Sequence, residues 1–116
     1  MLPSKNRLAK DWAINKVRRR GRKLKTKYFQ ISSLPRKRSG ESRFAFVVPI
    51  RYSKKATERN LLKRRARSSI KTHLSKIKRG YDFVLAFFPE AKDLGAQELL
   101  LELENSLRRG NYLLTK

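Results

Sequence analysis

Residues 81–89 read YDFVLAFFP, and this stretch predicts the central strand of a β-sheet. It is rich in aromatic and aliphatic side chains, it is apolar throughout after Asp82, and Pro89 ends it. A strand with one face in water alternates polar and apolar residues, whereas a continuous apolar run indicates a strand that is covered on both faces. We therefore expect the rest of the chain to be arranged around residues 81–88.

Two helices are expected on either side of this strand along the chain. The first should run from about residues 56–59 to about residue 78, because apolar side chains recur at helical spacing. This stripe consists of Leu62, Ala66, Ile70, His73 and Ile77. The second helix should be capped by Asp93. Its packing face should consist of Ala96, Leu99, Leu100, Leu103 and Leu107.

Earlier in the chain, two strands and a short helix are expected. Side chains alternate with a period of two in residues 25–34 and 43–50, and the turn-forming stretch PRKRSGES lies between them. This arrangement predicts an antiparallel hairpin. Before it, Asp11 should cap a very basic helix that ends near Arg20 at Gly21.

The order of these elements, α-β-β-α-β-α, predicts an α+β fold in which helices pack on one mixed sheet to form a sandwich. With 116 residues, the chain is long enough for one domain with a modest core. We expect residues 1–116 to form a single domain, in which the polar and basic residues 1–10 could be a flexible arm.

The charge of the chain indicates a polyanionic partner. There are 31 Lys and Arg residues against 9 Asp and Glu, which gives a formal net charge of +22. The excess is concentrated in residues 1–80, which hold 27 basic and 3 acidic side chains. No stretch is long and apolar enough to span a membrane, and the start of the chain lacks the apolar segment of a signal peptide. We therefore expect a cytoplasmic protein that binds nucleic acid and has no membrane partner.

The composition disfavours catalysis by the chain itself. It has no cysteine, and its one histidine, His73, is expected to pack on the long helix, so neither a thiolate site nor a histidine cluster can form. The few acidic residues in the basic part of the chain are scattered, whereas two-metal nucleases use clustered carboxylates. We expect no catalytic residue, metal ligand, cofactor or small-molecule ligand in the protein.

The residues best suited to bind a polyanion lie in and beside residues 50–67, IRYSKKATERNLLKRRAR, which carry eight positive charges. On a helix these charges form a fixed stripe, and arginine can donate two parallel hydrogen bonds to a phosphate. The candidate RNA-binding residues are Arg51, Lys54, Lys55, Arg59, Asn60, Lys63, Arg64, Arg67 and Lys71. Asn60 could instead fix the start of the helix, and Arg59 could make a structural contact at the edge of the core.

Within this stretch, Arg59-Asn60 followed by Lys63-Arg64 and Arg67 resembles the signature RN-R-x-K-R-x-x-R of bacterial ribonuclease P proteins. The flanking sequence also resembles that family, so the resemblance covers nearly the whole chain. The matching segments are MLPSKNRL at the start, Gly21 with Tyr28-Phe29, Arg43 to Val48, and Tyr81 to Pro89. One departure is Leu61, where the family commonly has a further arginine.

The resemblance implies a fold like that of the ribonuclease P protein and of the second domain of ribosomal protein S5. It also implies a subunit of a ribonucleoprotein endonuclease, in which a catalytic RNA removes the 5′ leader of precursor tRNA with Mg²⁺. The expected partners are ribonuclease P RNA, which would dock on the signature helix, and precursor tRNA, whose leader would bind another surface.

The resemblance places leader-binding candidates at Ile14, Arg18, Tyr28 and Ser32, where three residues replace aromatic ones usual in the family. We expect Phe29 to belong to the core and Tyr28 to lie on the other face of its strand. An alternative function is that of a structural RNA-binding protein of the ribosomal type, which would share the size and charge. Stimulation of RNA-catalysed cleavage would distinguish the two functions.

Overall fold

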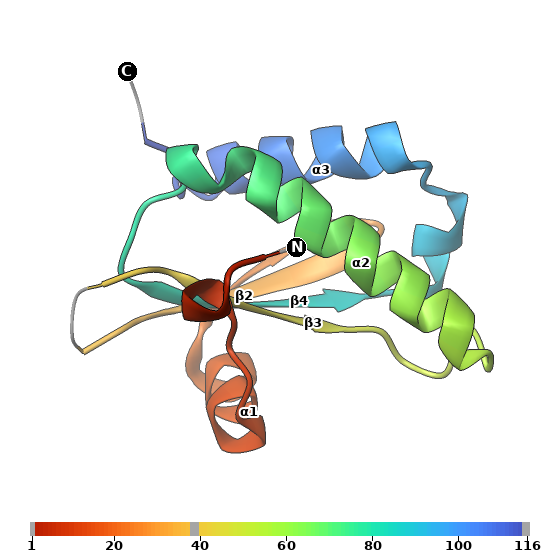
Figure 1. Ribbon diagram of the computed structural model, residues 1–116, viewed down its shortest axis with the longest axis horizontal. Coiled ribbons are helices and arrows are strands. Elements are labelled where there is room, and N and C mark those ends of the chain that lie inside the picture. The colour runs from red at the N-terminus through yellow and green to blue at the C-terminus, as the bar shows by residue number, and fades with distance from the viewer. Residues whose placement is uncertain (1, 38–39, 115–116) are drawn as a thin grey trace.

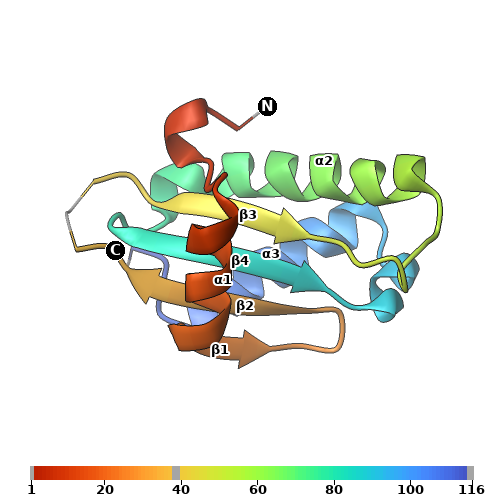
Figure 2. The same ribbon diagram turned by 90° about the horizontal axis from the view of Figure 1, so that it is seen from below.

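The computed structural model describes residues 2–37 and 40–114, which form a four-stranded sheet with helices on both faces (Figures 1 and 2). The strands are β1 (Arg22–Lys25), β2 (Phe29–Pro35), β3 (Arg43–Val47) and β4 (Tyr81–Phe87). The helices are α1 (Asp11–Arg20), α2 (Ala56–His73) and α3 (Ala96–Arg109), with short 3₁₀ turns at Ser4–Asn6, Leu74–Lys76 and Pro89–Asp93. The α+β class with helices on a mixed sheet is confirmed.

Strand β4 lies inside the sheet, as its apolar sequence predicts. The strand order is β1-β2-β4-β3, in which β4 pairs antiparallel with β2 and parallel with β3. In this register Phe87 is opposite Phe29 and Phe83 is opposite Phe44. Helix α2 connects β3 to β4, which is the usual way to join neighbouring parallel strands.

The predicted hairpin between residues 25–34 and 43–50 is wrong, because β4 lies between β2 and β3. The chain runs in opposite directions along β2 and β3, as the turn-forming sequence predicts, but reversal alone does not show whether the two strands pair directly. An apolar strand needs neighbours on both sides to cover its backbone, so β4 separates them. Residues 38 and 39 of this predicted turn lie outside the described residues. Ile50, expected to end the second strand, is largely exposed.

The sheet also contains a strand that the sequence pattern missed. Strand β1, with the sequence RKLK, has one apolar residue, so its pattern is weak. It forms the real hairpin with β2 through a turn at residues 26–28, in which Thr26 Oγ1 accepts the backbone N–H groups of Tyr28 and Phe29 at 3.1 Å each. A short, charged strand is typical of a sheet edge, where lysines discourage pairing with other chains.

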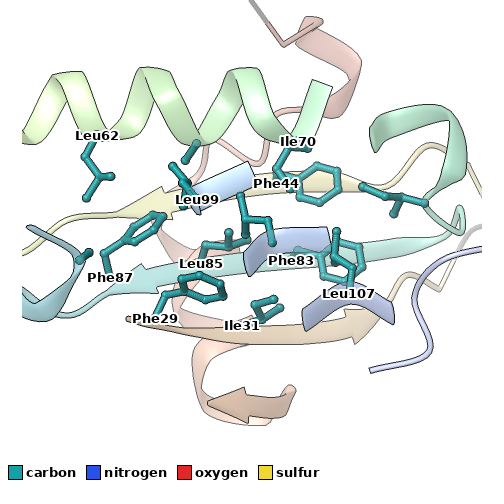
Figure 3. Packing of buried hydrophobic residues seen from close by; sticks show 14 of the residues in the cluster. Phe29, Ile31, Phe44, Leu62, Ile70, Phe83, Leu85, Phe87, Leu99 and Leu107 are labelled. Carbon is teal, nitrogen blue, oxygen red and sulfur yellow. The ribbon is translucent and has the colours of Figure 1, made fainter. Parts of the chain in front are cut away.

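The main core lies between the sheet and the helices α2 and α3, as Figure 3 shows. The predicted stripe of α2 is buried from Leu62 to Ile77, and His73 is buried with it. From β3 and β4, Phe44 and Phe83 stack with ring centroids 4.9 Å apart. Burying this apolar surface is the dominant favourable contribution to folding.

A smaller core lies on the opposite face, beneath α1. Ala13 and Val17 of α1 pack there with Ala45 and Val84 of the sheet, and Leu8 joins them. The segment that we expected as a possible flexible arm lies against the protein between residues 2 and 8. Leu2 is buried in the main core, Arg7 forms a bridge with Phe44, and Asn6 Nδ2 donates to the backbone oxygen of Ser42 at 2.9 Å.

Several predicted helix ends need correction. Gly95, not Asp93, is the N-cap of α3, and its N–H donates to Glu98 Oε1 at 2.8 Å. Asp93 belongs to the preceding 3₁₀ turn, and Ala96 is exposed because it lies in the first turn, away from the sheet. Lys10 caps α1, so Asp11 is its first helical residue, where its charge still favours the helix dipole. Helix α2 ends at His73, five residues before the predicted end.

Within the described ranges, no helix is long and apolar enough to cross a lipid bilayer.

Candidate nucleic-acid interface

The start of helix α2 is fixed by a hydrogen-bond network around Ser53. Ser53 Oγ accepts the backbone N–H of Lys55 at 3.1 Å and donates to Glu58 Oε1 at 2.5 Å. Arg59 donates from Nη1 to the backbone oxygen of Ser53 at 2.8 Å. One side of the Arg59 guanidinium therefore holds the loop in place, and its remaining donors can reach an anion.

Beside this network, Tyr52 is half-buried, and burial raises the pKa of its hydroxyl above the ordinary value. The positive charge of Arg65 opposes this rise in pKa, and the negative charge of Glu58 adds to it. Lys92 Nζ lies 5.7 Å from the centre of the Tyr52 ring, so the ring joins the loop before α2 to the 3₁₀ turn before α3. Tyr52 therefore helps to hold the loop that carries Arg51, Lys54 and Lys55.

The structure brings the predicted α2 residues onto one side of the helix, but at different depths. Asn60, Arg64 and Lys71 are exposed, whereas Lys63 and Arg67 are half-buried. Asn60 does not fix the start of α2 as its cap, because Lys55 is the N-cap of this helix. Arg51, Lys54 and Lys55 are exposed in the loop before the helix and extend the same basic surface. We call the nine predicted RNA-binding residues together the α2 stripe.

The charges of the α2 stripe are not neutralised by the protein. Among the residues that the structure describes, acidic partners form ion pairs with Lys5, Arg36, Arg43, Arg79 and Arg108, and with no member of the stripe. Several like charges held on one rigid helix repel one another, and the binding of a polyanion relieves this repulsion. The stripe is therefore suited to contact a phosphate backbone.

A second candidate surface is the part of the sheet that α1 leaves uncovered. By strand register, Lys25, Gln30, Ala86 and Val47 form one row across all four strands, on the face that carries α1. All four are at least partly exposed. In Figure 2 this face is turned to the viewer, with α1 lying across the strands. We call this row the sheet surface.

Aromatic side chains border the sheet surface at the end where β4 stops. Lys25 Nζ lies 5.6 Å from the ring centre of Phe88, and Lys27 Nζ lies 5.7 Å from that of Tyr28. Both rings are half-exposed, so they could stack with bases while the lysines contact phosphates. Phe88 and Lys25 were missed in the sequence because residue 88 was assigned to the buried strand. Their proximity follows from strand register, which the sequence pattern does not give.

The predicted leader-binding residues differ in how far the structure exposes their side chains. Arg18 is exposed on α1, and Ile14 is half-buried beside the smaller core. Phe29 is fully buried in the main core as expected, but the half-buried Tyr28 packs against the same core, so its predicted place on the other face is wrong: it precedes β2 and does not follow that strand's alternation. Ser32 is only 2% exposed because it lies in register with Val84, beneath α1, so the structure does not bring it to the surface.

The α2 stripe and helix α1 meet in a hollow of about 230 Å³. Its lining includes Lys63 and Arg67 of α2, Ile14 of α1 and Phe46 of β3. Residues from the stripe and from the predicted leader-binding set thus share one depression. A single RNA assembly could therefore contact the α2 stripe and α1 at once. Arg65, by contrast, lines a separate groove between α2 and α3, together with Ser68 and Gln97.

Nothing in the described ranges resembles a metal site, because no three His, Cys, Asp or Glu side chains are grouped to hold an ion. The most enclosed acidic group, Asp82, is engaged by Arg43, whose Nε and Nη2 donate to its two carboxylate oxygens at 2.8 Å each. These hydrogen bonds raise the pKa of Arg43 above its ordinary value, although partial burial of the guanidinium opposes the change.

Comparison with known proteins places these surfaces in context. The family model for Ribonuclease P matches residues 2–111. The ribonuclease P protein component of Synechococcus elongatus is 31% identical over 116 residues, which cover 97% of this chain and 95% of the relative. That of Synechocystis is 34% identical over 89% of this chain and 83% of the relative.

Solved structures show the same fold. The RNase P protein of Staphylococcus aureus matches with a TM-score of 0.84 at 22% identity, covering 92% of this chain and 96% of that chain. The RNase P protein of Thermotoga maritima matches with a TM-score of 0.76 at 25% identity, covering 92% of this chain and 97% of that chain.

Proposed function

Because this chain belongs to the ribonuclease P protein family, we propose that it binds that enzyme's catalytic RNA through the α2 stripe and the precursor tRNA leader beside α1. It is thus a protein subunit of a tRNA-processing endoribonuclease, and its two candidate surfaces have separate tasks. The observation that carries the proposal is the shared hollow, which Lys63 and Arg67 of the stripe line together with Ile14 of α1. An RNA held on α2 would therefore lie next to α1, beside which we propose that the leader binds.

The stripe is the surface better suited to structured RNA. Proteins contact double-stranded RNA mainly through its shape and phosphates, and a rigid row of arginines and lysines provides such contacts. The sheet surface is better suited to a single strand, because the half-exposed rings of Tyr28 and Phe88 at its border can stack with unpaired bases. The leader of precursor tRNA is the segment that we propose for it.

We infer that hydrolysis is carried out by the catalytic RNA with Mg²⁺, and that the protein contributes binding and positioning. The proposal is supported by the donor groups of the chain, since the described residues group no carboxylates or histidines that could hold metal ions at a reaction centre. The protein would instead raise the affinity for the precursor and offset repulsion between RNA phosphates. We propose that the protein acts in the cytoplasm and that it binds no small-molecule ligand.

The proposed function is tested by cleavage of a 5′-extended precursor tRNA with ribonuclease P RNA of the source organism, with and without the protein, at low Mg²⁺. We expect the protein to stimulate cleavage at the mature 5′ end, and to do so mainly by lowering KM, because its contribution is to binding. Tight RNA binding without any stimulation would contradict the proposal and favour a structural protein of the ribosomal type.

A further inference from the structure

Trp12 is the largest side chain on α1, and it takes no part in the core. Its side chain is 67% exposed, whereas its neighbours Ala13 and Val17 form the buried face of the helix. Exposing an indole in water forfeits the free energy of burying it, so an exposed tryptophan beside a hollow marks a candidate binding surface.

The indole stands between two adjoining hollows of the α1 face. One, of about 310 Å³, lies between α1, the end of β2 and the start of β3, and Lys16, Leu34 and Lys37 line it with Trp12. The other, of about 240 Å³, is lined by Trp12 with Arg7 and Lys10. The larger hollow shares no lining residue with the hollow where the α2 stripe meets α1, whereas the smaller one shares Arg7, Leu8 and Ala9 with it and so adjoins it.

The charge around the indole is positive and available. Among the described residues, no acidic side chain pairs with Lys10, Lys16 or Lys37. The carboxylate of Asp82, which lines the larger hollow, is already held by two hydrogen bonds from Arg43. An incoming phosphate would therefore meet three free ammonium groups and a carboxylate whose charge is compensated.

We propose that Trp12 is a stacking platform for one unpaired base of the precursor's 5′ leader, with Lys10, Lys16 and Lys37 contacting the flanking phosphates. An aromatic ring beside lysines fits single-stranded RNA, because bases in a duplex are already stacked on one another. Helix α1 lies on the face of the sheet surface proposed for the leader, while α2 and α3 cover the opposite face. The inference therefore rests on the proposed function and adds a base contact that neither candidate surface includes.

The protein carries its own probe for this contact, because Trp12 is its only tryptophan. The fluorescence of the full-length protein, assembled with ribonuclease P RNA, therefore reports on this one side chain. Adding precursor tRNA with a leader should quench the emission, because stacking on a base changes the surroundings of the indole. The same tRNA with a mature 5′ end should leave the emission unchanged.

Affinity gives an independent readout. Trp12→Ala should weaken holoenzyme binding of leader-bearing precursor by about tenfold or more, since stacking on an aromatic side chain contributes substantially per base. Trp12→Phe should retain most of the affinity, because phenylalanine can still stack. Leu101→Ala, which truncates another exposed apolar side chain on α3, is the matched control and should have no effect. Binding of mature tRNA should be the same in all four proteins.

The leader position is identified by placing single abasic nucleotides along the leader. One position should weaken binding to the wild type but not to Trp12→Ala, because both changes remove the same contact. If ribonuclease P RNA alone quenches the Trp12 emission and precursor tRNA adds no further quenching, the base that stacks on Trp12 does not belong to the leader. If the protein stimulates cleavage but Trp12→Ala binds precursor as tightly as the wild type does, the role of Trp12 as a stacking platform is overturned. The proposed function then still stands.

Discussion

At position 21 the chain has no space for a side chain. A Cβ atom there would lie 2.5 Å from the backbone oxygen of Val17 and 2.7 Å from that of Ser33. Gly21 therefore lets the end of α1 approach β2 closely enough to cover the sheet. The backbone angle φ is −71°, so close approach, and not an unusual conformation, explains the glycine.

We predict that Gly21→Ala destabilises the protein by about 1–3 kcal/mol, because both obstructing atoms belong to the backbone and cannot rotate away. Urea unfolding at neutral pH measures the change. Arg20→Ala, at an exposed position one residue earlier, is the control and should change the free energy of unfolding by less than about 0.5 kcal/mol. Equal stability of the two variants would contradict the close packing of α1 on β2.

The pair formed by Arg43 and Asp82 joins neighbouring strands with two parallel hydrogen bonds. Because the pair is partly screened by solvent, we expect Asp82→Asn to cost about 1–2 kcal/mol in the free energy of unfolding. A double-mutant cycle with Arg43→Gln measures the coupling between the two side chains. A coupling near zero would show that the pair contributes little to the sheet.

Among the elements, α2 shows how one helix serves packing and binding at once. Its buried side, with Leu62, Ala66 and Ile70, faces the sheet, while Asn60 and Arg64 lie on its exposed side. The two sides are separate because helical periodicity returns to the same face every three or four residues. Charges can therefore be removed from the stripe without disturbing the core.

We predict that Arg64→Ala combined with Arg67→Ala weakens binding to ribonuclease P RNA and reduces the slope of log Kd against log salt by about 1–2. The slope falls because binding releases fewer counterions from the RNA when the protein makes fewer phosphate contacts. The fold, followed by circular dichroism, should be unchanged. The control is Arg108→Ala with Arg109→Ala, which removes the same charge from the end of α3. If the salt slope of the α2 variant equals that of the wild type, the stripe is not a phosphate-binding surface.

Across the whole molecule, the excess positive charge opposes folding. The described residues extend over 37 × 33 × 25 Å, so at low salt each charge acts on nearly all the others. The Debye length is about 30 Å at 0.01 M salt and about 8 Å at 0.15 M. Screening should therefore stabilise the isolated protein, even though it weakens RNA binding.

We expect the Tm of the free protein to rise when NaCl increases from about 0.01 M to about 0.15 M, as measured by thermal unfolding. A variant with Arg18, Arg19 and Arg20 changed to Gln has less self-repulsion and should show a smaller rise. A Tm that falls with salt would mean that attractive ion pairs, such as Arg79 with Glu41, dominate the stability.

The central strand, the buried side of α2, the basic stripe and the family resemblance could all be predicted from the amino-acid sequence. Each of these depends on residue type and local spacing, which the chain carries in order. Three features could not be predicted in this way: the position of β4 between β2 and β3, the burial of Ser32 beneath α1, and the hollow that Ile14 and Lys63 both line. These depend on strand order and on which face a helix covers, and both are set by contacts between residues far apart in the chain, to which local periodicity is insensitive.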